Sequence, residues 1–187
     1  MIDTVAEETF ITDTIARIKR EFRHLVSLKA KWFVHRILPA DTLLVEWKNR
    51  GRLELEIDLA QWFSSRDKLT QLLWYELAFI RDELDPAFGY PIDYVRDNYG
   101  PGAPRERFYH LIRMCWCVTV CGRLSRKQVP VHHKDVVHGH YVECYGTTDF
   151  AAETFNKLFN MERPTFTEIE TIAKQLYKNR PTVNEPA

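Results

Sequence analysis

The sequence predicts an α+β fold, in which a small antiparallel sheet of about three strands packs on an N-terminal and a central helix and precedes a mostly helical C-terminal half. Three observations predict it. Apolar residues recur at helical spacing over residues 4–28, and they alternate with other residues over 31–57, as they do in strands. A long apolar segment, 69–84, then has the length and composition of a buried helix.

The N-terminal helix is predicted from its start and from its apolar face. Thr4 and Glu7 form a capping-box pattern, and apolar residues follow at spacings of three and four. Three strands should come next, the last two as a hairpin around the Asn-Arg-Gly turn at 49–51. Acidic residues alternate with apolar ones in the third strand, which predicts a solvated face or, as the alternative, a cleft wall or an edge strand.

Residues 69–84 should form the central helix of the protein. Ser64, with Asp67 three residues later, offers a helix start, and the proline of Asp85-Pro86 cannot continue the helix. Glu76 is the one charged residue in the middle of this apolar segment. A buried carboxylate costs on the order of several kcal/mol unless it is paired, so we expect Glu76 to form an ion pair or hydrogen bonds. Its candidate partners are Arg81, Arg113 and Arg123.

The rest of the chain is predicted to continue the same single domain, residues 1–187, because no linker is long enough to divide it. An irregular loop rich in proline and glycine should lead to a helix over 105–124. Two amphipathic helices should close the chain, the second beginning with a capping box of Thr165 and Glu168. The predicted segments are a core at 5–125, a His-rich loop at 126–146, C-terminal helices at 147–179 and a frayed tail at 180–187.

Charge and hydropathy exclude several classes of function. The formal net charge is zero, so the molecule as a whole should attract neither nucleic acid nor a membrane surface. The apolar runs are too short to span a bilayer, and the N-terminal residues MIDTVAEETF do not resemble a signal peptide. Three of the four cysteines fall within 115–121, a spacing that disfavours a disulfide framework. We therefore expect a cytoplasmic protein.

The segment LLWYELAFIRDEL, at 72–84, resembles the active-site helix of the zincins, a group of zinc metallopeptidases. That helix carries His-Glu-x-x-His, in which two histidines bind zinc and the glutamate acts as general base on the metal-bound water. Glu76 stands at the glutamate position, whereas Tyr75 and Phe79 replace the two histidines. The resemblance implies a zincin-like core over 5–125 in which Glu76 is a vestigial catalytic residue.

A second helix is similar to the gluzincin helix that brings a carboxylate to the metal. In RMCWCVTVCGRLSR the acids of its Glu-x-x-x-Asp pattern are replaced by Cys117 and Cys121. Both histidine and both acid positions have changed together, which implies that the catalytic zinc site is gone. Our hypothesis is a catalytically inactive domain that serves as a binding or structural module for a protein or peptide partner, and that binds no cofactor. The residues expected to bind the ligand or partner are Trp74, Tyr75, Phe79, Tyr90, Cys117 and Cys121.

The His-rich loop carries the alternative hypothesis. It contains His132, His133, His138 and His140, with Cys144 close by, and imidazole and thiolate are ligands for zinc and other transition metals. In an extended segment His138 and His140 would point to one side. A metal site of His138, His140 and Cys144 would then serve a metal-dependent hydrolase, with Glu76 or Glu143 as base. An ordinary polar loop is the interpretation that the spacing favours.

Overall fold

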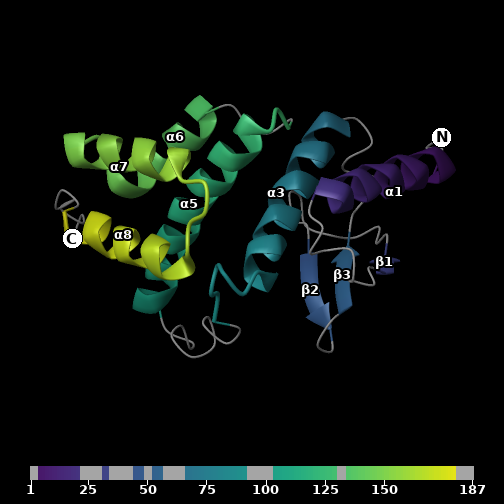
Figure 1. Cartoon of the computed structure of the whole chain (residues 1–187), viewed down its shortest axis with the longest axis horizontal. Helices are drawn as coiled ribbons and strands as arrows, with labels where there is room; N and C mark the ends of the chain where they lie inside the picture. Colours follow the sequence, from purple (N-terminus) through teal and green to yellow (C-terminus); the bar gives the residue numbers. More distant parts are fainter. Residues whose placement is uncertain are drawn as a thin grey trace. The chain divides into compact units, whose positions relative to one another are not determined.

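The computed structural model divides the chain into two compact units, Met1–Arg81 and Asp82–Ala187, which we call the N-terminal unit and the helical unit. Figure 1 shows the elements of both units. The residues that the structure describes are 4–21, 31–33, 44–48, 52–56, 66–91, 103–129 and 134–179. The prediction of a single domain stays a prediction.

The N-terminal unit contains helix α1, Thr4–Glu21, and three short strands. The strands are β1 (Lys31–Phe33), β2 (Leu44–Lys48) and β3 (Arg52–Glu56). They are ordered β1-β3-β2, and β2 pairs with β3 in the antiparallel hairpin that the turn at 49–51 predicts. Strand β1 instead runs parallel to β3, so the expectation of a wholly antiparallel sheet is wrong.

The predicted α+β class is also wrong, because the structure indicates an all-helical fold. Of the residues whose side chains the structure describes, 82% are helical and none lies in a strand. The alternation over 31–57 is a local pattern that here corresponds only to strands of three to five residues. Helices account for nearly all of the side-chain packing that can be described.

Helix α3, Arg66–Leu84, is the predicted central helix, and it begins three residues earlier than the apolar segment. Asp67 lies in its first turn, where a carboxylate interacts favourably with the helix dipole. Leu73, Trp74, Tyr75, Leu77, Ala78, Phe79 and Ile80 are all buried, so the helix is apolar on every side as its sequence predicts. Glu76 is half-buried among them.

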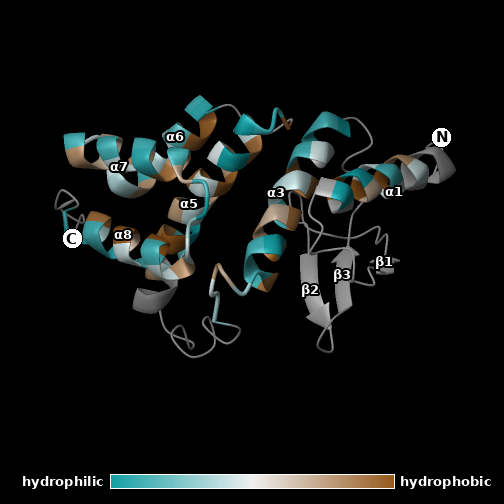
Figure 2. Cartoon of the chain, viewed as in Figure 1, coloured by the Kyte–Doolittle hydropathy of each residue, from teal (hydrophilic) through white to brown (hydrophobic). Residues whose placement is uncertain are grey.

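The helical unit is built around α5, Ala103–Arg126, which contacts three shorter helices. These are α6 (Lys134–Tyr145), α7 (Asp149–Asn160) and α8 (Phe166–Lys178). In Figure 2 hydrophobic and hydrophilic residues alternate along α7 and α8, as expected of amphipathic helices that cover a core. The core side chains of α5 are Leu111, Ile112, Cys115, Trp116, Val118, Val120, Cys121 and Leu124.

Helices α5 and α7 cross in close contact at Gly122. A Cβ atom added there would lie 1.8 Å from the carbonyl oxygen of Phe159, so only glycine permits this approach. Arg126, one turn later, donates to the same oxygen at 2.7 Å and to the carbonyl oxygen of Met161 at 2.9 Å. The crossing therefore brings the C-terminal ends of two helices together, with an arginine on the free carbonyls of one of them.

The predicted His-rich loop at 126–146 is wrong for most of its length, because α6 occupies Lys134–Tyr145. Val137, Tyr141 and Tyr145 recur every four residues and are buried. The tyrosine hydroxyls explain how polar-looking residues form a core face, since Tyr141 donates to the carbonyl oxygen of Ala151 at 3.0 Å. His138, Gly139 and His140 are all exposed, and these polar and small residues concealed the helical period in the sequence.

The capping box predicted at the start of α8 is confirmed. The Glu168 carboxylate accepts the backbone N–H of Thr165 at 2.8 Å, and the Thr165 hydroxyl accepts the backbone N–H of Glu168 at 3.2 Å. These hydrogen bonds favour the charged carboxylate and lower the pKa of Glu168 below its ordinary 4.5.

A depressed pKa in the folded state means that Glu168 contributes stability above pH 4.5, and that this contribution is lost as the pH falls through the folded pKa. We expect Glu168→Gln to be slightly less stable at neutral pH and to lose less stability on acidification than the wild type. Urea unfolding at neutral pH and below pH 4.5 measures both. Glu153→Gln, at an exposed position of α7 outside any cap, is the matched control and should keep the wild-type acid dependence.

Candidate functional site

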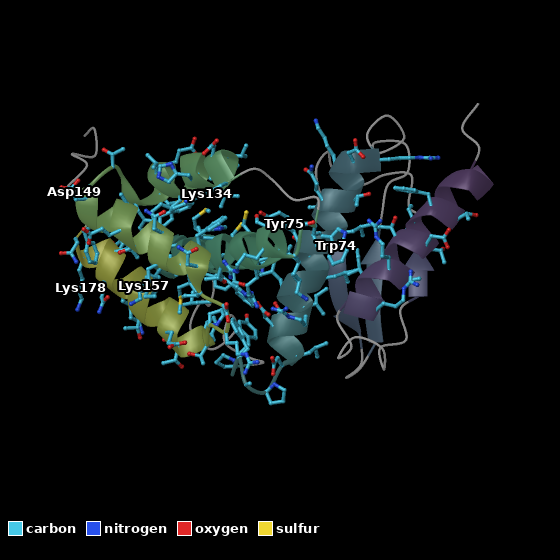
Figure 3. All side chains as sticks on the ribbon, turned by 45° about the horizontal axis from the view of Figure 1, so that its top comes forward. Trp74, Tyr75, Lys134, Asp149, Lys157 and Lys178 are labelled. Atoms are coloured by element: carbon cyan, nitrogen blue, oxygen red, sulfur yellow. The ribbon has the colours of Figure 1, made fainter. Side chains whose placement is uncertain are left out.

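The six residues predicted to bind a ligand or partner fall in different units. Trp74, Tyr75 and Phe79 belong to the N-terminal unit, where their side chains are 2%, 5% and 4% exposed. Figure 3 labels Trp74 and Tyr75 on α3. Tyr90, Cys117 and Cys121 belong to the helical unit. A cleft shared by the two sets therefore stays a prediction.

Cys117 and Cys121 lie one helical turn apart on α5, as the zincin comparison requires of them. Cys117 is half-buried and Cys121 is fully buried, with its sulfur 4.0 Å from the hydroxyl oxygen of Ser125. Residues four apart share a helix face, so the two thiols are neighbours on that face. Small, buried thiols of this kind commonly act as apolar packing residues.

Tyr90 takes part in an aromatic cluster within the helical unit. Its ring lies 5.5 Å from the ring of Trp116 and 5.0 Å, edge to face, from that of Phe166. Phe88 stacks on Trp116 at 4.8 Å, and its carbonyl oxygen accepts the backbone N–H of Phe166 at 2.8 Å. Burial, and then the neighbouring Tyr109, raise the pKa of Tyr90 well above its ordinary range, so its hydroxyl stays protonated. The cluster joins the segment after α3 to the start of α8.

A buried ion pair, which the sequence analysis missed, lies beside this cluster. The Asp82 carboxylate accepts two hydrogen bonds from the Arg123 guanidinium, one of them at 2.9 Å, and a third from the Trp116 indole N–H at 2.8 Å. The two charged side chains are 3% and 12% exposed. Arg123 was a candidate partner of Glu76, and the structure pairs it with Asp82 instead. Position 82 follows Ala78 and Phe79 by four and three residues, a spacing that places it on a buried face of α3.

Cys115 is buried against Tyr145, with 3.1 Å between its sulfur and the tyrosine oxygen. The Tyr145 hydroxyl donates its single proton to the carbonyl oxygen of Leu111 at 2.6 Å, so the thiol is the donor in the Cys115–Tyr145 contact. Burial raises the pKa of Cys115 to about 12. The nucleophilic form of cysteine is the thiolate, so a thiol with this pKa is inert at neutral pH.

We expect this protection to be measurable. Iodoacetamide added to the folded protein at neutral pH should leave Cys115 unmodified, because its thiol is both buried and protonated. The half-buried Cys144 serves as the internal comparison and should react first. Peptide mass spectrometry reads both sites, and unfolding in urea should remove the difference. Equal labelling of the two cysteines in the folded protein would contradict the buried contact.

The residues predicted to bind a metal are not brought together by α6. His138 and His140 are two positions apart on a helix and so point to different sides, whereas His140 and Cys144 share one side. The His138 ring packs edge to face on Phe155, with 4.7 Å between the ring centres. Across the described part of the chain, no three His, Cys, Asp or Glu side chains gather in a way that could hold a metal ion. His132 and His133 lie outside the described residues.

Within the described ranges, none of the helices combines the length and the hydropathy that a membrane crossing requires. Searches with this sequence and structure found no significant match to a protein-family model, to a characterised protein or to a solved structure. The similarity to zincins therefore stays a prediction from sequence, carried by the positions of Glu76, Tyr75 and Phe79.

Proposed function

We propose that this chain is a catalytically inactive binding module for a protein or peptide partner. The observation that carries the proposal is that two potentially reactive side chains of the helical unit, Asp82 and Cys115, are held in buried contacts. The Asp82 carboxylate accepts hydrogen bonds from Arg123 and Trp116, and the Cys115 thiol contacts the hydroxyl of Tyr145. A general base or a nucleophile must reach its substrate and titrate near the working pH. Buried groups whose polar atoms already bond to other side chains are therefore better suited to stabilising the fold.

A rigid frame also supports a binding role. The closely packed crossing at Gly122, the Asp82–Arg123 pair and the capping box of α8 each constrain one part of the helical unit. Side chains carried on such fixed helices lose little freedom when they bind a partner, which reduces the entropic cost of association. The alternative of a hydrolase that uses the histidine cluster gains no support, because α6 separates His138 from His140.

The test separates binding from chemistry. Tagged full-length chain is isolated from its native cells with its bound proteins, and each candidate partner is then purified and titrated against the chain by calorimetry. We expect a saturable complex that Glu76→Gln leaves intact, since Glu76 would have no catalytic task. A chemical turnover by the wild type that Glu76→Gln abolishes, with thermal stability unchanged, would overturn the proposal.

Metal content provides an independent check. The purified chain is dialysed gently and its transition metals are measured by elemental analysis. We expect less than about a tenth of an equivalent of any such metal. A site with enough ligands would hold its metal through mild dialysis, so this measurement would detect a true metal site. A stoichiometric metal that His140→Ala removes would instead revive the hydrolase hypothesis.

A further inference from the structure

We infer that the helical unit binds an acidic segment of its partner through a basic surface at the C-terminal end of α7, made of Arg126, Lys134 and Arg163. This inference rests on the proposed binding function and names the chemistry of the partner. The three residues come from the end of α5, the start of α6 and the turn after α7, and all are exposed. Together they bring positive charge from three segments of the helical unit to the end of one helix.

Contacts within the helical unit hold two of these cations, Arg126 and Lys134, in position. Arg126 donates to the carbonyl oxygens of Phe159 and Met161, and Arg163 follows Met161 by two residues. The Lys134 ammonium donates to the side-chain oxygen of Asn156 at 3.2 Å and lies 5.0 Å from the centre of the Phe159 ring. Arg126 and Lys134 therefore both contact the C-terminal end of α7, Arg126 at the backbone of Phe159 and Lys134 at its ring.

These contacts leave some N–H donors of Arg126 and Lys134 available to bind a partner. A guanidinium has five N–H donors and an ammonium has three, whereas Arg126 uses two and Lys134 uses one within the described residues. None of Arg126, Lys134 and Arg163 forms an ion pair with a carboxylate in the part of the chain that the structure describes. Two hydrogen bonds hold the planar guanidinium of Arg126, so the direction of its remaining donors is fixed, and charge-assisted donors bind carboxylates well.

The chemistry of the surface fits an acidic peptide better than a nucleic acid. Asp135 and Glu162 directly adjoin Lys134 and Arg163 in sequence, and the chain as a whole has no net charge. A phosphate backbone carries closely and regularly spaced negative charge, so these carboxylates would repel it. A peptide can instead place its acidic side chains only where the cations are. The half-buried Phe159 ring adds an apolar contact for the peptide stem.

The experiment uses the full-length chain and a fluorescein-labelled oligoglutamate peptide, with fluorescence anisotropy as the readout. We expect binding at low salt that weakens as salt is added, because the contacts are exposed ion pairs. Lys134→Glu and Arg163→Glu should each reduce the affinity about five-fold or more, since reversal replaces an attraction by a repulsion.

Lys178→Glu is the matched control, because it changes the net charge equally. Lys178 lies in the last turn of α8, and Figure 3 labels it together with Lys134. It lies twelve positions after Phe166, the first residue of α8, which is a rise of roughly 18 Å along the helix. We expect Lys178→Glu to change the affinity by less than about two-fold.

Three results would overturn the inference. The oligoglutamate probe could fail to bind the wild type, Lys178→Glu could weaken binding as much as Lys134→Glu, or a single-stranded oligonucleotide of equal charge could bind more tightly through the same residues. The proposed binding function would survive each of them, because its own test uses partners isolated with the native chain. Loss of that partner complex in Lys134→Glu, with Lys178→Glu unaffected, would support both.

Discussion

Asp82→Ala should destabilise the protein by about 3–5 kcal/mol, the largest effect expected from any single substitution considered. The change leaves the Arg123 guanidinium nearly buried without its carboxylate, and it leaves the Trp116 indole N–H without its acceptor. The free energy of unfolding, measured by urea denaturation, gives the magnitude. A loss below about 1 kcal/mol would show that the pair is solvated and contributes like an ordinary surface salt bridge.

A double substitution distinguishes the value of the pair from the penalty of breaking it. In Asp82→Leu/Arg123→Met both charges are removed together and apolar groups occupy the space, so no buried charge is left uncompensated. We expect this double variant to be more stable than Asp82→Ala, although each of its substitutions alone should be destabilising. Equal loss in the single and double variants would mean that packing, rather than charge, decides the stability at this position.

The sequence predicted the helices wherever a start signal and a regular apolar face coincide. Both conditions hold for α8, with Thr165 and Glu168 at its start and Phe166, Ile169, Ile172 and Leu176 on one face, and its predicted start lies within a residue of the observed one. Helix α3 was found for its largely apolar composition. Helix α6 was missed because its buried face is built of Val137, Tyr141 and Tyr145, whose hydroxyls need partners that only the tertiary structure supplies.

The candidate site shows the same limit. Sequence spacing correctly placed Cys117 and Cys121 on one face of a helix, because that relation is local. The pairing of Arg123 with Asp82 joins residues 41 positions apart, so no local pattern contained it. The prediction that the rings of His138 and His140 point to one side was wrong because the local backbone was taken as extended. The helix instead rotates one ring away from the other.

The second large effect is expected at Gly122, where alanine should cost about 3 kcal/mol or more. The new methyl group would lie 1.8 Å from the carbonyl oxygen of Phe159, and the obstruction is backbone rather than a flexible side chain. Helix α7 would have to move away from α5, which would also disturb the two hydrogen bonds of Arg126 to the end of α7. Overpacking of this kind usually costs about 1–3 kcal/mol, and the lost hydrogen bonds add to it.

Gly139 provides a control in the same unit, because its added Cβ would meet nothing within 4 Å on the exposed face of α6. There the same change should stabilise the protein by about 0.5–1 kcal/mol, since alanine loses less backbone entropy than glycine on forming a helix. Urea denaturation of Gly122→Ala and Gly139→Ala should thus give shifts of opposite sign. Two stabilising shifts would mean that the close α5–α7 crossing does not exist in solution, and with it the arrangement that holds Arg126 at the end of α7.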